Sequence, residues 1–282
     1  MIKDIYRFLN PKHQKLFLEY KVDFKPRYGH GKPAHPELFK IIESGREKYR
    51  EIISRILPLK EKIWEIKDSK SESGIPEPSW NNGYLPGLDI VSLYSVISIF
   101  KPSKYIEIGS GNSTKVAYKA KRDCCPDMEI ISIDPLPRTD IEGLISNMIN
   151  EPLEKASLNL PDLLSENDIL SIDGSHRLFP NSDSMVFFLE VLPNLRKGVI
   201  VHIHDIYLPY DYPQFMCDRY YSEQYCLAIY LLANPKRFEI MMPNYFISQD
   251  NELSELISPV WNHKNLENAE RHGGSFWMKI AE

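Results

Sequence analysis

Acidic and histidine side chains follow two predicted strands at the points where the chain leaves them. Asp173 and His176 come directly after the apolar segment 168–172, and His204 and Asp205 follow the next predicted strand. Because ligands of open parallel sheets bind at the carboxyl ends of the strands, we expect these four residues to form one site. A histidine that is poised near neutral pH is suited to take a proton from a hydroxyl group, while carboxylates orient it or hold the substrate.

The same residue types leave two alternatives open. Asp173, His204 and Asp205 offer the oxygen and nitrogen ligands of a divalent metal ion, which would lower the pKa of a chelated hydroxyl group. In the second alternative, His176 caps the next helix or makes a hydrogen bond to a loop, and His202 and His204, which share one face of a strand, only make hydrogen bonds within the sheet.

A glycine-containing loop follows the first predicted strand. Residues 105–114 read Tyr-Ile-Glu-Ile-Gly-Ser-Gly-Asn-Ser-Thr. Gly109 and Gly111 let the backbone turn sharply and approach a ligand closely. The three residues that follow can cap a helix. A strand, a glycine turn and a helix in this order are typical of a nucleotide-type site.

The loop favours S-adenosylmethionine over a dinucleotide as the ligand. The dinucleotide pattern has a third glycine where this chain has Thr114, and Glu107 is expected to point a carboxylate at the place of the pyrophosphate, where like charges repel. A ligand with a sulfonium and an amino group fits better. Asp134, after the second predicted strand, can accept both hydroxyls of a ribose; alternatively it is a turn residue before Pro135.

Strands and helices alternate regularly after residue 80, which predicts a parallel sheet with right-handed crossovers. The expected strands are 105–108, 128–133, 149–153, 168–172, 198–203, 238–242 and 273–280. The expected helices are 89–100, 113–121, 140–148, 182–192 and 222–232. Before residue 80 we expect an irregular arm, a helical segment from Pro36 that ends or kinks at Pro58, and a linker over 69–78.

Two loops are candidates for covering the site. The turn-rich segment 80–89 precedes the first strand, and either lies over the cofactor or only leads into a helix that Asp89 caps. The segment 207–225 is rich in Tyr and Pro. Its rings suit a sugar, a polyol or an aromatic acceptor, or else form a packed cluster that holds the last helix.

Composition is that of a globular protein, with 282 residues, 43% hydrophobic and 26% charged. The N-terminal residues lack a secretory pattern, the four cysteines form no CxxC, and no apolar run reaches the roughly 18–20 residues of a membrane span. We therefore expect a cytoplasmic protein with reduced thiols and no membrane partner.

Residues 1–70 carry 17 Lys and Arg against 10 Asp and Glu. This excess of positive charge predicts either a solvated helical face or an arm that docks on an acidic surface. Nucleic-acid binding proteins often carry basic runs interleaved with aromatic residues; the sequence has no such run, so we expect no nucleic-acid partner.

Several motifs together resemble one family of class I S-adenosylmethionine-dependent methyltransferases, the methyltransferase domain 24 type. They are Glu-Ile-Gly-Ser-Gly-Asn-Ser-Thr, Ile-Asp-Gly-Ser-His, His-Ile-His-Asp-Ile-Tyr-Leu-Pro-Tyr-Asp-Tyr-Pro, Ser-Glu-Gln-Tyr and Gly-Gly-Ser-Phe-Trp, in this order over roughly residues 80–280. The resemblance implies an α/β, Rossmann-like methyltransferase fold, with a mostly parallel seven-stranded sheet, helices on both faces and an antiparallel last strand at Gly274–Ile280. A helical extension and linker would occupy 1–79, and the methyltransferase domain 80–282.

The resemblance also implies the cofactor site. S-adenosylmethionine would lie on the loop, with Asp134 on the ribose and Asp173 close by; the loop residues are Glu107, Gly109, Ser110, Gly111, Asn112 and Ser113. Related sugar O-methyltransferases hold a divalent metal with acids after strands four and five and use a histidine base. Asp173, His176 and Asp205 match those positions, whereas His204 stands where the metal-dependent members have an acid, so we do not assign a metal site.

These observations predict a methyltransferase that acts on a hydroxyl group of a small or glycosidic molecule, with His176 as the base and Asp173, His204 and Asp205 positioning the acceptor. One alternative is a nicotinamide-dependent oxidoreductase. Another is a non-catalytic binding protein on the same scaffold. The N-terminal arm is a candidate for homo-oligomer contacts.

Overall fold

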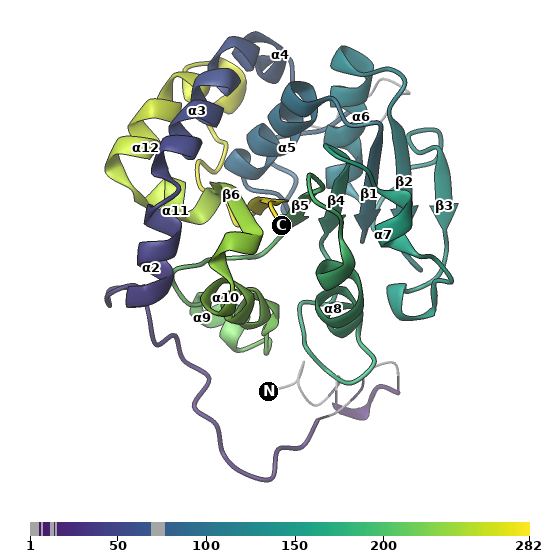
Figure 1. The fold of residues 1–282 in the computed structure, drawn as a ribbon, viewed down its shortest axis with the longest axis vertical. Coiled ribbons are helices and arrows are strands. Elements are labelled where there is room, and N and C mark those ends of the chain that lie inside the picture. Colours follow the sequence, from purple (N-terminus) through teal and green to yellow (C-terminus); the bar gives the residue numbers. More distant parts are fainter. Residues whose placement is uncertain (1–5, 7, 12–13, 15, 69–76) are drawn as a thin grey trace.

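A seven-stranded sheet lies at the centre of the computed structural model, which describes residues 6, 8–11, 14, 16–68 and 77–282 (Figure 1). The strand order is β3-β2-β1-β4-β5-β7-β6. All neighbours are parallel except β7, which runs antiparallel to β5 and β6. The strands are β1 (Lys104–Ile108), β2 (Glu129–Ile133), β3 (Asn147–Ile149), β4 (Ile169–Ile172), β5 (Ile200–Ile203), β6 (Phe238–Pro243) and β7 (Phe276–Ile280). The predicted fold, including the antiparallel last strand, is confirmed.

The central strands are buried on both faces. Every residue of β4 and β5 is buried, and in β1 only Lys104 is partly exposed. These strands are rich in Ile and Val, which suit a pleated surface covered by helices on both sides. The carboxyl ends of β1, β2, β4 and β5 therefore form one edge, where polar side chains gather.

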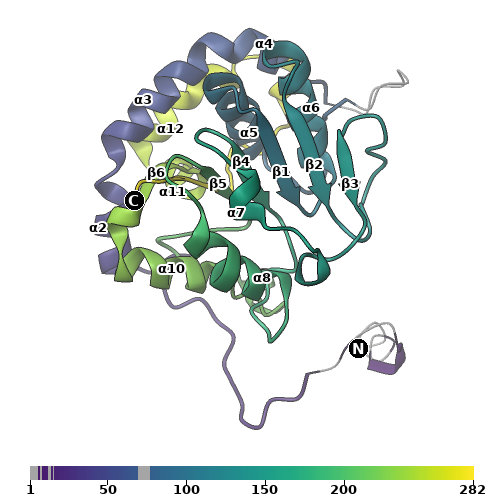
Figure 2. The same cartoon turned by 45° about the vertical axis from the view of Figure 1, so that its right-hand side comes forward.

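Helices cover both faces of the sheet. Figures 1 and 2 show α5 and α6 on one face and α8 and α10 on the other. The helices that follow residue 80 are α5 (Gly87–Phe100), α6 (Asn112–Cys124), α7 (Leu160–Leu163), α8 (Asp183–Val186), α9 (Gln214–Cys217), α10 (Glu223–Ala233), α11 (Asn244–Gln249) and α12 (Asn251–Ile257). A π-helical turn at Phe187–Val191 continues α8, so the predicted helix over 182–192 has a wider turn in its second half.

Before residue 80, two helices and a short third one pack against the body. They are α2 (Pro36–Glu43), α3 (Arg46–Ile56) and α4 (Lys60–Trp64), and Ile42, Ile52 and Ile63 belong to the same hydrophobic core as the sheet. A 3-10 turn at Leu57–Leu59 marks the predicted kink at Pro58. The first described residues extend away from the body (Figure 2), and most of the predicted linker 69–78 lies outside the described residues. The division of the chain near residue 80 stays a prediction.

Two expectations about the segment after β2 are wrong. Residues 140–148 do not form a helix, because Ile141 and Leu144 are buried in turns and the backbone from Asn147 pairs with β2 instead. The third strand covers Asn147–Ile149 and ends at the residue where the expected strand 149–153 begins. The polar stretch after β6 contains α11 and α12, whose buried residues Phe246 and Leu253 are spaced among polar ones.

No helix in the described part of the chain is long and apolar enough to cross a membrane. All four cysteines are free thiols.

Candidate functional site

The loop after β1 is pressed against the loop after β4. Gly109 has a φ of +81°, and a Cβ built on it would lie 2.1 Å from the carbonyl oxygen of Asp173. Both the left-handed backbone and this close approach require glycine. The next turn is closed by the Gly111 amide, which donates to Thr114 Oγ1 at 3.0 Å. The predicted glycine turn therefore brings the first and fourth strand ends together.

Glu107 lies beneath this loop and lines neither of the two adjoining cavities that are described below. Its carboxylate is fully buried and accepts hydrogen bonds from Ser113 Oγ at 3.1 Å, Tyr105 Oη at 3.3 Å and Thr114 Oγ1. Burial raises the pKa of Glu107 to about 8, although the hydroxyl donors act in the opposite direction. The carboxylate thus holds the start of α6, and it does not point to the place of a pyrophosphate as we had expected. Its direct contact with a cofactor stays a prediction.

Replacing Glu107 with Gln is expected to make stability less dependent on pH. The pKa of Glu107 is about 8 in the folded protein against an ordinary value of 4.5. The contribution of its protonated carboxyl group to the free energy of unfolding is therefore fully present below pH 4.5 and is lost as the pH rises through 8. The neutral amide avoids that loss, and the difference in unfolding free energy between pH 5 and pH 8 should shrink by roughly 3 to 4 kcal/mol. Urea unfolding of both proteins at the two pH values measures it; an unchanged difference would contradict the assignment.

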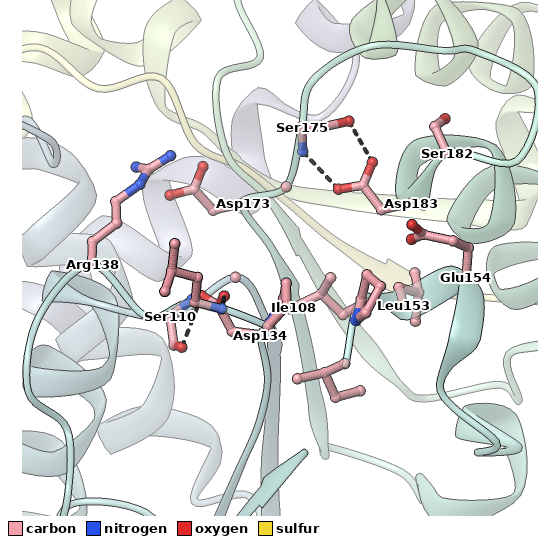
Figure 3. Close-up of a pocket in the computed structure, with 16 residues that line it drawn as sticks. Ile108, Ser110, Asp134, Arg138, Leu153, Glu154, Asp173, Ser175, Ser182 and Asp183 are labelled. Carbon is pink, nitrogen blue, oxygen red and sulfur yellow. Dashed lines mark hydrogen bonds between the residues drawn. The ribbon is translucent and has the colours of Figure 1, made fainter. Parts of the chain in front are cut away.

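A cavity of about 470 Å³ opens at the ends of β1, β2 and β4 (Figure 3). Asp134 stands in its wall, where one carboxylate oxygen accepts from the Ser110 amide at 2.8 Å and the other from the Leu136 amide at 2.7 Å. Apolar side chains such as Ile108 and Leu153 form another part of the wall. An acid beside an apolar slot fits a nucleoside, whose ribose is polar and whose base is flat.

A second cavity, of about 180 Å³, lies at the start of α6. It is lined by the predicted loop residues Ser110, Gly111, Asn112 and Ser113 and also by Asp173. The N-terminus of a helix favours negative charge because its first amides lack partners within the helix. The predicted cofactor residues, Gly109 among them, therefore surround two adjoining cavities, apart from Glu107, which lies below them.

His176 is buried and lies in a cluster with three acids, of which Glu223 is buried and Asp173 and Asp205 are partly exposed. Its Nδ1 is 2.6 Å from Glu223 Oε1, and its Nε2 is 3.3 Å from Asp173 Oδ1 and 3.6 Å from Asp205 Oδ2. The ring stacks on Tyr221 with centroids 4.4 Å apart. Burial favours the neutral ring, but Glu223 and Asp173 outweigh it and raise the pKa of His176 to about 10. His176 makes none of the helix-capping contacts of the alternative interpretation, since Ser182 caps α8.

His204 occupies the other side of the cluster. Its Nε2 is 3.3 Å from Asp89 Oδ2, and its Nδ1 is 3.6 Å from one oxygen each of Asp173 and Asp205. Burial opposes the cation, but these carboxylates raise the pKa of His204 well above its ordinary value. Neither ring nitrogen makes a hydrogen bond to any described residue, although the side chain is buried. The four residues predicted from the strand ends therefore meet.

The cluster contains a set of atoms that could bind a metal ion. One ligand atom from each of Asp173, His176 and Asp205 lies within 4.8 Å of the others. The pKa of Asp173 is held well below its ordinary value, since burial is outweighed by His204 and His176.

His202, by contrast, bridges Ser171 Oγ at 2.7 Å and Ser275 Oγ at 2.8 Å inside the sheet, and so is structural.

A third cavity, of about 690 Å³, opens from the cluster. The acids and histidines of the cluster form one end, and aromatic side chains form much of the wall. The aromatic residues are Tyr84, Tyr207, Phe215, Tyr221 and Tyr245. Both loops that we expected near the site, 80–89 and 207–225, contribute to this wall. Tyr207, Tyr212 and Tyr221 also belong to a packed apolar cluster, so this loop both packs and lines the cavity, and the binding of an acceptor by its rings stays a prediction.

Sequence reasoning missed several residues of the site. Glu223, the partner of His176, begins α10 and is 47 residues away along the chain. Asp89 caps no helix; its carboxylate accepts from the amides of Gly274 and Ser275 and faces His204. Arg138 lines all three cavities. The Ser-Glu-Gln-Tyr motif was a signal for Glu223, whereas Arg138 had none.

Comparisons with known proteins agree with this picture. Residues 106–206 match the model of a family described as a methyltransferase domain. An uncharacterized protein of Archaeoglobus fulgidus is 30% identical over 95 residues, which are 32% of this chain and 43% of the relative. The matched stretch thus spans less than half of that curated relative.

Solved structures with detectable similarity include several methyltransferases. The S-adenosylhomocysteine-bound methyltransferase PaMTH1 of Podospora anserina is 15% identical, with 69% of this chain and 79% of that chain covered and a TM-score of 0.41. The plantazolicin methyltransferase BpumL, in complex with a monoazolic substrate analogue and S-adenosylhomocysteine, is 14% identical, with 88% and 91% covered and a TM-score of 0.42. The O-methyltransferase TomG of Streptomyces achromogenes, in complex with S-adenosylmethionine, is 13% identical, with 67% and 78% covered and a TM-score of 0.37.

Residues 106–206 are therefore similar to a methyltransferase domain, and the observed strand order with its antiparallel last strand is the one that we expected for such a fold.

Proposed function

We propose that this protein transfers a methyl group from S-adenosylmethionine to a hydroxyl group of a small molecule. The observation that carries the proposal is the position of Asp173, which lines both the nucleoside-type cavities and the aromatic cavity. A transfer reaction requires donor and acceptor to lie side by side, and a shared wall residue supports this arrangement.

The chain's own residues fit the cofactor. Asp134 is proposed to accept from the ribose, and the loop from Ser110 to Ser113 to hold the methionine end near the start of α6. When bound, S-adenosylmethionine supplies an electrophilic methyl carbon; its carbon–sulfur bond breaks as the bond to the acceptor oxygen forms, and the hydroxyl proton leaves to a base. Glu107 is proposed to support this loop from below.

His176 is proposed to take the hydroxyl proton. Its Nε2 faces Asp173 and Asp205, and Glu223 fixes the ring through Nδ1. Since the surrounding acids raise the pKa of His176 to about 10, only the small neutral fraction can accept a proton at pH 7. Activity that relies on this base alone should therefore rise with pH up to about 10.

A divalent metal ion is a second candidate for activating the hydroxyl group. The clustered ligand atoms of Asp173, His176 and Asp205 favour it, as does the buried His204, whose ring nitrogens lack hydrogen-bond partners among the described residues. Glu223 would then hold the other nitrogen of a ligating histidine, an arrangement common around protein-bound metals. Such an ion lowers the pKa of a coordinated hydroxyl group.

Replacing His176 with Ala is expected to lower kcat by about 10² to 10⁴, because it removes either the base or a ligand, while S-adenosylhomocysteine still binds. A thermal-shift screen over an acceptor library, with S-adenosylhomocysteine and with or without Mg²⁺, identifies an acceptor for this assay. Turnover that the substitution leaves unchanged would exclude both roles of His176. Activity that resists chelators and rises toward pH 10 supports His176 as the general base. If Mg²⁺ does not stabilise the protein, the hypothesis that a metal ion activates the hydroxyl group is rejected.

The acceptor and the assembly of the protein are proposals as well. We propose a small-molecule acceptor and a cytoplasmic location, with no nucleic-acid or membrane partner. Exposed apolar side chains on the N-terminal arm, among them Leu9, Phe17 and Tyr20, support homo-oligomer contacts through this segment.

A further inference from the structure

Two arginines in the wall of the aromatic cavity have no acidic partner in the part of the chain that the structure describes. They are Arg138 and Arg219. Several other arginines are paired with carboxylates, such as Arg46 with Asp250 at 2.6 Å and Arg122 with Glu77 at 2.7 Å. The two guanidinium groups are therefore cations whose hydrogen-bond donors point to no carboxylate of the protein.

Each guanidinium group is nevertheless held in place. Arg138 Cζ lies 5.3 Å from the ring centroid of Tyr84, and Arg219 Cζ lies 4.7 Å from that of Tyr221. The backbone of Arg219 is fixed as well, because its carbonyl oxygen accepts from Arg177 Nε at 2.9 Å. Stacking on a ring leaves the edge of a guanidinium group, where its donors lie, free for a ligand.

The positions of the two arginines relate them to the reacting end of the site. The ring of Tyr221, over which the Arg219 guanidinium group lies, also stacks on the His176 ring. Arg138 borders the cavities that share Asp173, and Figure 3 shows its side chain on the same side of the site as the Asp173 carboxylate. A molecule that fills the aromatic cavity can thus meet acids and imidazoles at one end and guanidinium groups along its wall.

We propose that the acceptor carries an oxyanion, either a carboxylate or a phosphate, which Arg219 and Arg138 bind while the hydroxyl group lies at His176. The inference rests on the proposed function and names the substrate class. Guanidinium groups offer paired donors that match the oxygens of a carboxylate or phosphate. Asp173 and Asp205 repel an anion, so the charge pattern of the cavity would also set the orientation of the acceptor.

The test uses pairs of hydroxylated compounds that differ only in charge. Carboxylic acids are compared with their amides, and phosphate esters with their dephosphorylated forms, by titration into the full-length protein saturated with S-adenosylhomocysteine. The proposal predicts that the binders are mainly anions. Arg219→Gln and Arg138→Gln should each weaken the binding of the anions by at least about 10-fold and leave that of the neutral partners unchanged.

Arg55→Gln serves as the control, since Arg55 lies 5.2 Å from the ring of Phe100, outside the cavity, and its loss should change neither affinity. Preference for acids over phosphates, or the reverse, identifies the oxyanion. Binders that are mainly neutral, anion binding that Arg219→Gln leaves intact, or no anionic binder at all would overturn the inference. Failure to bind S-adenosylhomocysteine would instead reject the proposed function.

Discussion

Replacing Asp173 with Asn is expected to lower kcat/KM by about 10³-fold, a loss within the range expected for His176→Ala. The Asp173 carboxylate lies 3.3 Å from His176 Nε2 and 3.6 Å from His204 Nδ1, and it borders every cavity of the site. Asparagine keeps the shape but removes the charge that stabilises both imidazolium ions, so His176 and His204 lose their common partner.

Glu154→Gln is the matched control for this prediction. Glu154 lines the nucleoside-type cavity that Asp173 also lines, but it does not line the aromatic cavity that contains both histidines, and its loss should change kcat/KM by less than about 10-fold. Steady-state kinetics of the three proteins with one acceptor measures the difference, and calorimetric titration with S-adenosylhomocysteine separates binding from turnover. Asp173→Asn with more than a tenth of wild-type activity would show that the carboxylate is not central to the reaction.

Replacing Gly109 with Ala is expected to destabilise the protein by about 3 kcal/mol and to weaken cofactor binding. The new Cβ would lie 2.1 Å from the Asp173 carbonyl oxygen, a backbone atom that cannot rotate away, and the residue would keep a φ of +81°. The loops after β1 and β4 would have to separate. Since both contribute to the cavities, the effect should reach S-adenosylhomocysteine as well as folding.

Gly143 offers a control with the same backbone geometry and open space around it. Its φ is +80°, and a Cβ there would have no neighbour within 4 Å. Gly143→Ala should therefore cost only the left-handed backbone, about 1 kcal/mol. Denaturant unfolding of the two variants measures both numbers, and equal losses would show that the contact with Asp173 is not what requires glycine at position 109.

The polar residues at the strand ends could be predicted because the sheet alone brings them together. Asp134, Asp173 and His204 each follow an apolar run, and parallel strands end at one edge. Burial could not be predicted in the same way. Glu107 shares a strand face with Tyr105, and only the packed structure shows that this face is turned to α6 and away from the cavity.

Long-range partners and the edge of the sheet escaped prediction for different reasons. Glu223 contacts His176 only because α10 packs beside the carboxyl end of β4. No local sequence pattern predicts a contact between residues that are so far apart along the chain. The segment 140–148 carries apolar residues at helical spacing, yet Gly143 has positive φ and the backbone at Asn147 completes a ladder with β2. Pairing at a sheet edge here overrides a periodic pattern.

Equilibrium titration of the purified protein with S-adenosylhomocysteine and, separately, with NAD tests the central claim most directly. The account predicts saturable binding of S-adenosylhomocysteine at one site per chain, weakened by Gly109→Ala, and no saturable binding of NAD. Saturable binding of NAD without binding of S-adenosylhomocysteine would contradict it.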